Sequence, residues 1–412
     1  MFLEDRVIQR KTLVERFMRH FCLCVCLVSL ESFGQSDDFS EVLRQAETGD
    51  ADAEYALGVR FKTGDGGTQN NLKAVEWFSK AAAQGQTMAQ FELGTMYDQG
   101  LGIPENNRLA VQFYKQAAEA DLAQAQYSLA RMYESGKAVP DNPADTASWM
   151  LRAAEQEVLP AMLKIGDYYL AGEVFQLDLD EARRWFAKAA SRGDARANYE
   201  LGKIYANPDF SESNAELAFS FFSKAADANH VGAQAELGDR YLNGIGVVRN
   251  GESGTFWTQR AAQENNPLAQ RNLGLLYFEG RYLQRDYEQA AAMYQKSAEQ
   301  GDPVAQKNLA SMYHLGQGVQ QDDKKAFDWL QKSALQRYGL AQLNLGYAYR
   351  LGQGTRKSMI KSMQWYLLAE SEGQTAASFN LQKVASALSQ RDRAEARFLA
   401  DECLSSNYAD CD

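Results

Sequence analysis

The stretch Ala89-Gln90-Phe91-Glu92-Leu93-Gly94-Thr95-Met96-Tyr97 decides the fold, because its pattern returns every 36 residues along most of the chain. A small, a leucine-like and an aromatic residue stand at i, i+4 and i+8, the spacing of one face of an α-helix. The leucine-like position is occupied in nine successive units by Leu57, Leu93, Leu129, Ile165, Leu201, Leu237, Leu273, Leu309 and Leu345. Such a period predicts a solenoid whose units bury their faces against their neighbours.

A small residue follows the leucine-like residue in every unit. The residues at this position are Gly58, Gly94, Ala130, Gly166, Gly202, Gly238, Gly274, Ala310 and Gly346. Glycine inside a helix costs about 0.5–1 kcal/mol relative to alanine, so its recurrence indicates that a larger side chain does not fit. We expect the backbone of another helix to cross at this point.

A second helix is predicted in each unit by apolar residues at i, i+3, i+4, i+7 and i+8, as in Ala74 to Ala82. All six tryptophans share one register of this helix and are expected to be core posts: Trp77, Trp149, Trp185, Trp257, Trp329 and Trp365. Glycine pairs such as Gly100-Leu101-Gly102 join the two helices. They are turn glycines, because a phosphate-binding loop would need a preceding strand.

The block from Ala89 to Tyr97, the glycine turn after it and Ala117-Ala118-Glu119 resemble the Sel1-like repeat, a relative of the tetratricopeptide (TPR) repeat. The match recurs about nine times over residues 53–373. The resemblance implies an all-α fold, a right-handed α/α superhelix of helix-turn-helix repeats with a concave inner surface. It also implies an adaptor or scaffold for protein complexes.

The two ends differ from the repeats. Residues 35–52 are expected to hold an N-terminal capping helix, and residues 374–412 C-terminal capping helices and a cysteine-containing tail. Residues 1–34 predict a signal peptide, because the apolar run 21–30 follows basic residues and is shorter than the about 20 residues that span a bilayer. Met18 is an alternative start, and a short membrane anchor or a cytosolic protein are alternative interpretations.

Two cysteines, Cys403 and Cys411, remain if the leader is removed. They are expected to form a disulfide, which an oxidising compartment permits and which contributes roughly 2–3 kcal/mol in the chain-entropy model. The alternative is a pair of free thiols.

Composition restricts the function classes. The formal charge of −11 and a pI near 5.0 argue against nucleic-acid binding, which usually needs a basic patch. Beyond the leader only His230 and His314 remain, so a metal site or a Ser-His-Asp arrangement is not expected. His314 is interpreted as an exposed or satisfied histidine. The expectation is a protein that is not an enzyme and holds no cofactor.

The candidate binding site is the side of the first helix that does not carry the Ala, Leu and Tyr stripe. Its residues just after the Ala-Gln pair form a row: Tyr55, Phe91, Tyr127, Leu163, Tyr199, Ala235, Arg271 and Lys307. Aromatic residues followed by basic ones suit a groove for a peptide or helix. Packing between repeats is the alternative role.

Two turns depart from the pattern. The fifth unit reads Asn207-Pro208-Asp209-Phe210 in place of the turn glycines, and the third reads Lys137-Ala138-Val139-Pro140 after Gly136. The fifth connection must therefore take a different path. Both loops are either neutral variation or contacts to a partner.

The functional hypothesis is an exported, non-enzymatic scaffold that binds a protein partner in the bacterial cell envelope. The expected location is periplasmic or secreted, with membrane attachment only through an uncleaved leader. One alternative is a peptidoglycan- or polysaccharide-associated factor. Another is a secreted effector that binds a host protein.

Overall fold

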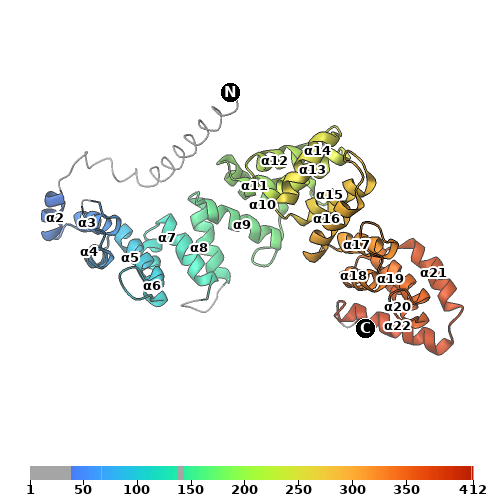
Figure 1. The fold of residues 1–412 in the computed structure, drawn as a ribbon. Helices are drawn as coiled ribbons and strands as arrows, with labels where there is room; N and C mark the ends of the chain where they lie inside the picture. Colours follow the sequence, from blue (N-terminus) through green and yellow to red (C-terminus); the bar gives the residue numbers. More distant parts are fainter. Residues whose placement is uncertain (1–38, 66, 137–142, 410, 412) are drawn as a thin grey trace, which may run out of the picture. The chain divides into compact units, whose positions relative to one another are not determined.

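The computed structural model describes residues 39–65, 67–136, 143–409 and 411, and among them it contains α-helices and no strand. Consecutive helices pair as helix-turn-helix units (Figure 1), which confirms the predicted all-α solenoid. The chain divides into two compact units, residues 1–177 and 178–412. The predicted leader, residues 1–34, and the loop 137–140 lie outside the described residues.

In the first unit the first described helix is α2, Phe39–Glu47, which lies in the segment predicted to cap the repeats and whose Val42 and Ala46 are buried. Its repeat helices are α3 (Ala51–Thr63), α4 (Asn71–Ala83), α5 (Thr87–Gln99), α6 (Asn107–Glu119), α7 (Ala123–Glu134), α8 (Pro143–Glu155) and α9 (Leu159–Ala171).

The second unit holds helices α10 to α22. They are α10 (Leu179–Ser191), α11 (Ala195–Ala206), α12 (Ala215–Asp227), α13 (Val231–Asn243), α14 (Gly251–Gln263), α15 (Pro267–Glu279), α16 (Tyr287–Glu299), α17 (Pro303–Leu315), α18 (Asp323–Leu335), α19 (Gly339–Leu351), α20 (Met359–Ser371), α21 (Thr375–Ala385) and α22 (Gln390–Ser405). Odd-numbered helices from α3 to α19 are the first helices of the repeats, and even-numbered helices from α4 to α20 are the second helices. Positions are counted below from the first residue of each first helix.

The boundaries between helices follow the predicted capping chemistry. Gly301 adopts φ of 95°, the left-handed conformation that ends α16, and Asp302 Oδ1 accepts a hydrogen bond from the Ala305 backbone at 2.6 Å. Pro303 then occupies the first turn of α17, where its missing N–H removes no helical hydrogen bond. Each repeat therefore starts immediately after the preceding one.

The glycine inside the first helix lies closest to an aromatic ring in five repeats. A Cβ added to Gly58, Gly94, Gly202, Gly274 or Gly346 would lie 2.6–2.9 Å from a ring carbon of Phe78, Tyr114, Phe222, Tyr294 or Tyr366, respectively. The predicted crossing of another helix backbone is found at Gly274 and Gly346, where the added Cβ would also lie 3.3 Å from the Ala290 carbonyl oxygen and 3.2 Å from the Ser362 carbonyl oxygen. At Gly58, Gly94 and Gly202 the three nearest atoms are all ring carbons. The ring belongs to the second helix of the same repeat.

Repeats with alanine in place of this glycine lack the ring. Ala130 shares its repeat with Met150, and Ala310 shares its repeat with Leu330. The glycine and the ring thus occur as a pair, because a methyl group on the first helix occupies the space that the ring needs. Gly238 is an exception, since Thr258 stands opposite it with Oγ1 2.5 Å from the added Cβ.

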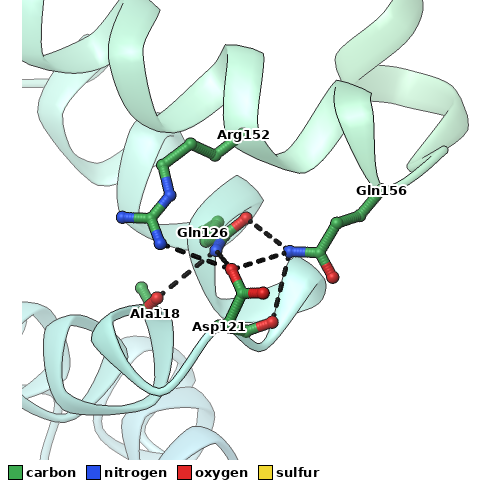
Figure 2. A network of polar contacts seen from close by, with 5 residues as sticks. All are labelled: Ala118, Asp121, Gln126, Arg152 and Gln156. Carbon is green, nitrogen blue, oxygen red and sulfur yellow. Dashed lines mark hydrogen bonds and ion pairs between the residues drawn. The ribbon is translucent and has the colours of Figure 1, made fainter.

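A glutamine at the fourth position of the first helix joins six of the repeats to the repeat before it. Gln126 Nε2 donates to the Ala118 carbonyl at 3.3 Å and to Asp121 Oδ1 at 2.8 Å, and its Oε1 accepts from Gln156 at 3.0 Å (Figure 2). Arg152 reaches the same Asp121 carboxylate at 3.3 Å. The donation to a carbonyl eight residues upstream recurs at Gln90, Gln234, Gln270, Gln306 and Gln342.

The glutamine network also explains two buried acceptors without a partner. Gln270 and Gln306 accept from Gln300 and Gln336 at the end of the second helix. Glutamate stands at the same position in two repeats, as Glu264 and Glu372, and a carboxylate cannot donate. The Oε1 atoms of the glutamines in those repeats, Gln234 and Gln342, have no hydrogen bond.

The C-terminal tail completes the last repeat. Helix α22 is followed by a turn whose Tyr408 hydroxyl lies 3.2 Å from both Gln342 Nε2 and Glu372 Oε1. Cys403 and Cys411 are joined by a disulfide, and the Cys411 carbonyl accepts from Gln364 at 2.9 Å. The tail therefore connects helices α19 and α20, which no further repeat covers.

The tryptophans, which the sequence predicts to be core posts, are buried to different degrees. Trp185 and Trp365 are buried, whereas the other four are half-buried against the cores of their repeats. A cation from the following turn covers the outer ring face, as with Lys80 Nζ at 3.7 Å from Trp77 and Lys332 Nζ at 4.1 Å from Trp329.

Candidate functional site

The first helices present their fifth, ninth, twelfth and thirteenth positions away from the stripe of Ala, Leu and Tyr, and this surface is called the first-helix face. The predicted row occupies its fifth position. Because the chain forms two units, Tyr55, Phe91, Tyr127 and Leu163 belong to one part of this face and Tyr199, Ala235, Arg271 and Lys307 to another.

The aromatic members of the row pack on rings inside their own repeats. Ring centroids of Tyr55 and Phe78 are 5.8 Å apart, and those of Phe91 and Tyr114 are 5.7 Å apart. Tyr127 lies under the Arg131 guanidinium at 6.0 Å. These side chains are half-buried, so they contribute to packing and still present an edge at the surface.

Tyr199 lies between two rings. It is 5.8 Å from Phe222 and stacks at 4.4 Å on His230. His230 is the N-cap of α13, and its Nδ1 accepts from the Ala233 backbone at 3.2 Å. Burial lowers the pKa of His230, so the neutral ring that can accept this bond is favoured. His230 therefore has a structural role here.

The basic members of the row already have polar partners within the chain. Arg271 forms an ion pair with Asp302 at 3.0 Å. Lys307 Nζ donates to Asn308 at 2.9 Å, and burial lowers the pKa of this lysine. Ala235 is fully buried, at 1% exposure, and cannot contribute a surface contact. The use of the row by a partner stays a prediction.

The more exposed apolar side chains stand at other positions of the first-helix face. Leu275 and Tyr347 occupy the ninth position and are 38% and 44% exposed. Leu315 and Leu351, at the ends of α17 and α19, are 60% and 46% exposed. The exposed ninth position can be identified in the sequence, because it directly follows the small residue of each first helix.

His314 lies on the same face. Its Nδ1 is 2.6 Å from Asp323 Oδ1, so the histidine has a partner. The nearby Ser311 hydroxyl donates to the Lys307 carbonyl at 3.1 Å. Within the described residues no group of three potential metal-binding side chains was found. No helix in that part of the chain is both long and apolar enough to cross a membrane.

The irregular fifth turn directs its aromatic residue inward. Phe210 is 4% exposed and meets Tyr205 edge to face at 5.7 Å. Asn207 ends α11 in an extended conformation instead of the left-handed one of the turn glycines. The different path is therefore confirmed, and its aromatic side chain packs within the repeat.

A family model for the Sel1 repeat matches residues 51–86, 87–122, 123–158, 159–194, 195–230, 231–266, 267–302, 303–338 and 339–374. The chain belongs to the Sel1 repeat family. Sel1 repeat proteins generally act as scaffolds for protein interactions. The matched segments begin at the first residue of each first helix and cover the range predicted from the sequence to within two residues at either end.

Two solved structures are similar to this Sel1 repeat protein. One is c5321, a protective antigen of uropathogenic Escherichia coli strains with an SLR fold, which is 26% identical, with a TM-score of 0.57, over 91% of this chain and 97% of that one. The other is a Sel1 repeat protein from Oxalobacter formigenes, 27% identical with a TM-score of 0.59 over 76% and 93%. Comparison with curated proteins gave no match.

Proposed function

We propose that this chain is an exported scaffold of the bacterial cell envelope that binds a protein partner along its first-helix face. The observation that carries the proposal is the set of exposed apolar side chains on α15, α17 and α19: Leu275, Leu315, Tyr347 and Leu351. Apolar residues that recur on one face of a soluble repeat array are typical of interaction surfaces.

Site-specific photo-crosslinking in the source bacterium tests the face. A benzophenone amino acid placed at Leu275 or Tyr347 is expected to give a protein adduct, because these side chains stand on the first helices. Leu217 on α12 and Phe256 on α14 are matched controls, since they are 43% and 56% exposed and stand on second helices. Adducts of equal yield at all four positions, or at the control positions alone, would contradict the proposal.

Export is supported by the apolar run 21–30 and by the disulfide between Cys403 and Cys411. We expect cell fractionation to recover the chain outside the cytoplasm, with a mature N-terminus near Gln35 by mass spectrometry. A chain recovered in the cytoplasm with its leader intact would refute this part of the proposal. The crosslinking result is independent of it.

A further inference from the structure

A small pocket opens on the first-helix face between α17, α18 and α19. Its volume is about 210 Å³. Its apolar floor is formed by five buried residues: Ala310, Ala326, Phe327, Leu330 and Ala348. The polar side chains at its mouth include Ser311, His314 and Asn344.

The pocket exists because this repeat lacks the ring that fills the same place elsewhere. Phe222 and Tyr294 stand at the position that Leu330 occupies, and each lies against the glycine that corresponds to Ala310. A leucine has less reach than a phenyl ring, so the space beyond its methyl groups is open. The hollow therefore has the dimensions of part of an aromatic side chain.

Its size indicates the class of ligand. Sites for drug-sized molecules and cofactors have volumes of about 300–1,000 Å³, which exceeds the 210 Å³ found here. An apolar cavity of about 150 Å³ is enough to bind benzene. One phenyl ring thus fits, and a nucleotide or a sugar chain does not.

The mouth provides groups that suit a peptide main chain. The Asp323 carboxylate can only accept, so His314 Nδ1 carries the proton of the 2.6 Å bond and Nε2 is the atom left for a ligand. Asn344 is exposed and offers both a donor and an acceptor. The floor residues, by contrast, have apolar side chains and would leave a phenol hydroxyl unsatisfied.

We propose that this pocket binds one phenylalanine side chain of an extended segment of the protein partner. The ring inserts between Ala310 and Leu330, and the flanking main chain meets His314 and Asn344. This inference rests on the proposed function, because it names the chemistry by which the first-helix face recognises its partner.

Methyl NMR with defined probes tests the pocket. Toluene and the peptide Ac-Ala-Ala-Phe-Ala-Ala-NH2 are each expected to give saturable shifts at the methyl groups of Ala310, Leu330 and Ala348. Replacing the central residue by alanine should weaken peptide binding about tenfold or more, because the burial of a phenyl ring is lost. An equally strong alanine peptide, or shifts elsewhere only, would overturn the proposal; a tyrosine peptide that binds better than phenylalanine would overturn the choice of residue.

The double variant Ala310→Gly/Leu330→Phe is the matched control. It gives this repeat the glycine and ring that other repeats contain, so it should fold and lose the shifts that both probes cause at the Ala348 methyl group. Asn344→Ala provides a second test, which does not depend on filling the pocket with a ring. It should weaken the phenylalanine peptide and leave toluene unchanged, whereas unchanged peptide binding would remove Asn344 and the main-chain contact from the proposal.

The two proposals can fail separately. Toluene binding at Leu330 without crosslinks from the first-helix face would support the pocket and contradict the scaffold function. Crosslinks from that face to a protein whose binding is unaffected by Ala310→Gly/Leu330→Phe would support the function and contradict the pocket.

Discussion

Gly202→Ala is expected to lower the free energy of unfolding by about 1–3 kcal/mol, the usual cost of overpacking a core. The added Cβ would lie 2.7 Å from the Phe222 ring. This cost should outweigh the gain in helix propensity, which favours alanine over glycine by about 1 kcal/mol. Urea unfolding followed by circular dichroism measures the change.

The second substitution Phe222→Leu should rescue Gly202→Ala. Leucine opposite alanine is the pairing that the protein itself uses at Ala310 and Leu330. Phe222→Leu alone should cost about 1–3 kcal/mol, because the smaller side chain leaves part of the ring's space empty, and the double variant should be more stable than the sum of the single changes implies. Additive costs would show that the ring and the glycine are not coupled.

Loss of the disulfide is expected to have the other large effect on stability. Replacing Cys403 and Cys411 together by alanine should lower stability by roughly 2–3 kcal/mol, because the short loop between them is no longer closed. The change should be local to α19, α20 and α22, since the tail holds Tyr408 against Gln342 and Glu372. Hydrogen exchange of α20 measures it.

A reductant provides the control for this prediction. Dithiothreitol should increase exchange in α20 of the wild-type protein and have no effect on the double alanine variant. Two free thiols in the non-reduced protein, or equal exchange in wild type and variant, would contradict a stabilising bridge. A tail without the disulfide would also leave the last repeat without its cover.

The helices and their boundaries were predictable because each signal is local. The apolar spacing around Leu93, the cap at Gly301-Asp302-Pro303 and the 36-residue period all act within one repeat. A crossing backbone was predicted, but the ring that lies closest to most of these glycines was not, since it requires knowing how the second helix folds back. The sequence nevertheless carries a signal for it, because Ala130 and Ala310 occur in repeats that have Met150 and Leu330 in place of the ring.

The candidate site was less predictable for a geometric reason. A helical wheel identifies which side of the first helix faces away from the stripe, and it correctly separates that side from Leu93 and Tyr97. It does not show that a fifth-position ring such as Tyr55 lies on Phe78, which half-buries it. Exposure at Leu275 and Tyr347, and the pocket beside Leu330, depend on the size of side chains from a neighbouring helix.

The central claim is that a partner is recognised where the first-helix face lacks an internal ring. The most direct test compares the affinity of the crosslinked partner for the wild-type chain and for a variant in which this ring is restored. Isothermal titration would compare wild type with Ala310→Gly/Leu330→Phe, after circular dichroism has shown equal folding. We predict a loss of affinity of about tenfold or more when the pocket is filled from within. Equal affinity for the two forms would contradict the account.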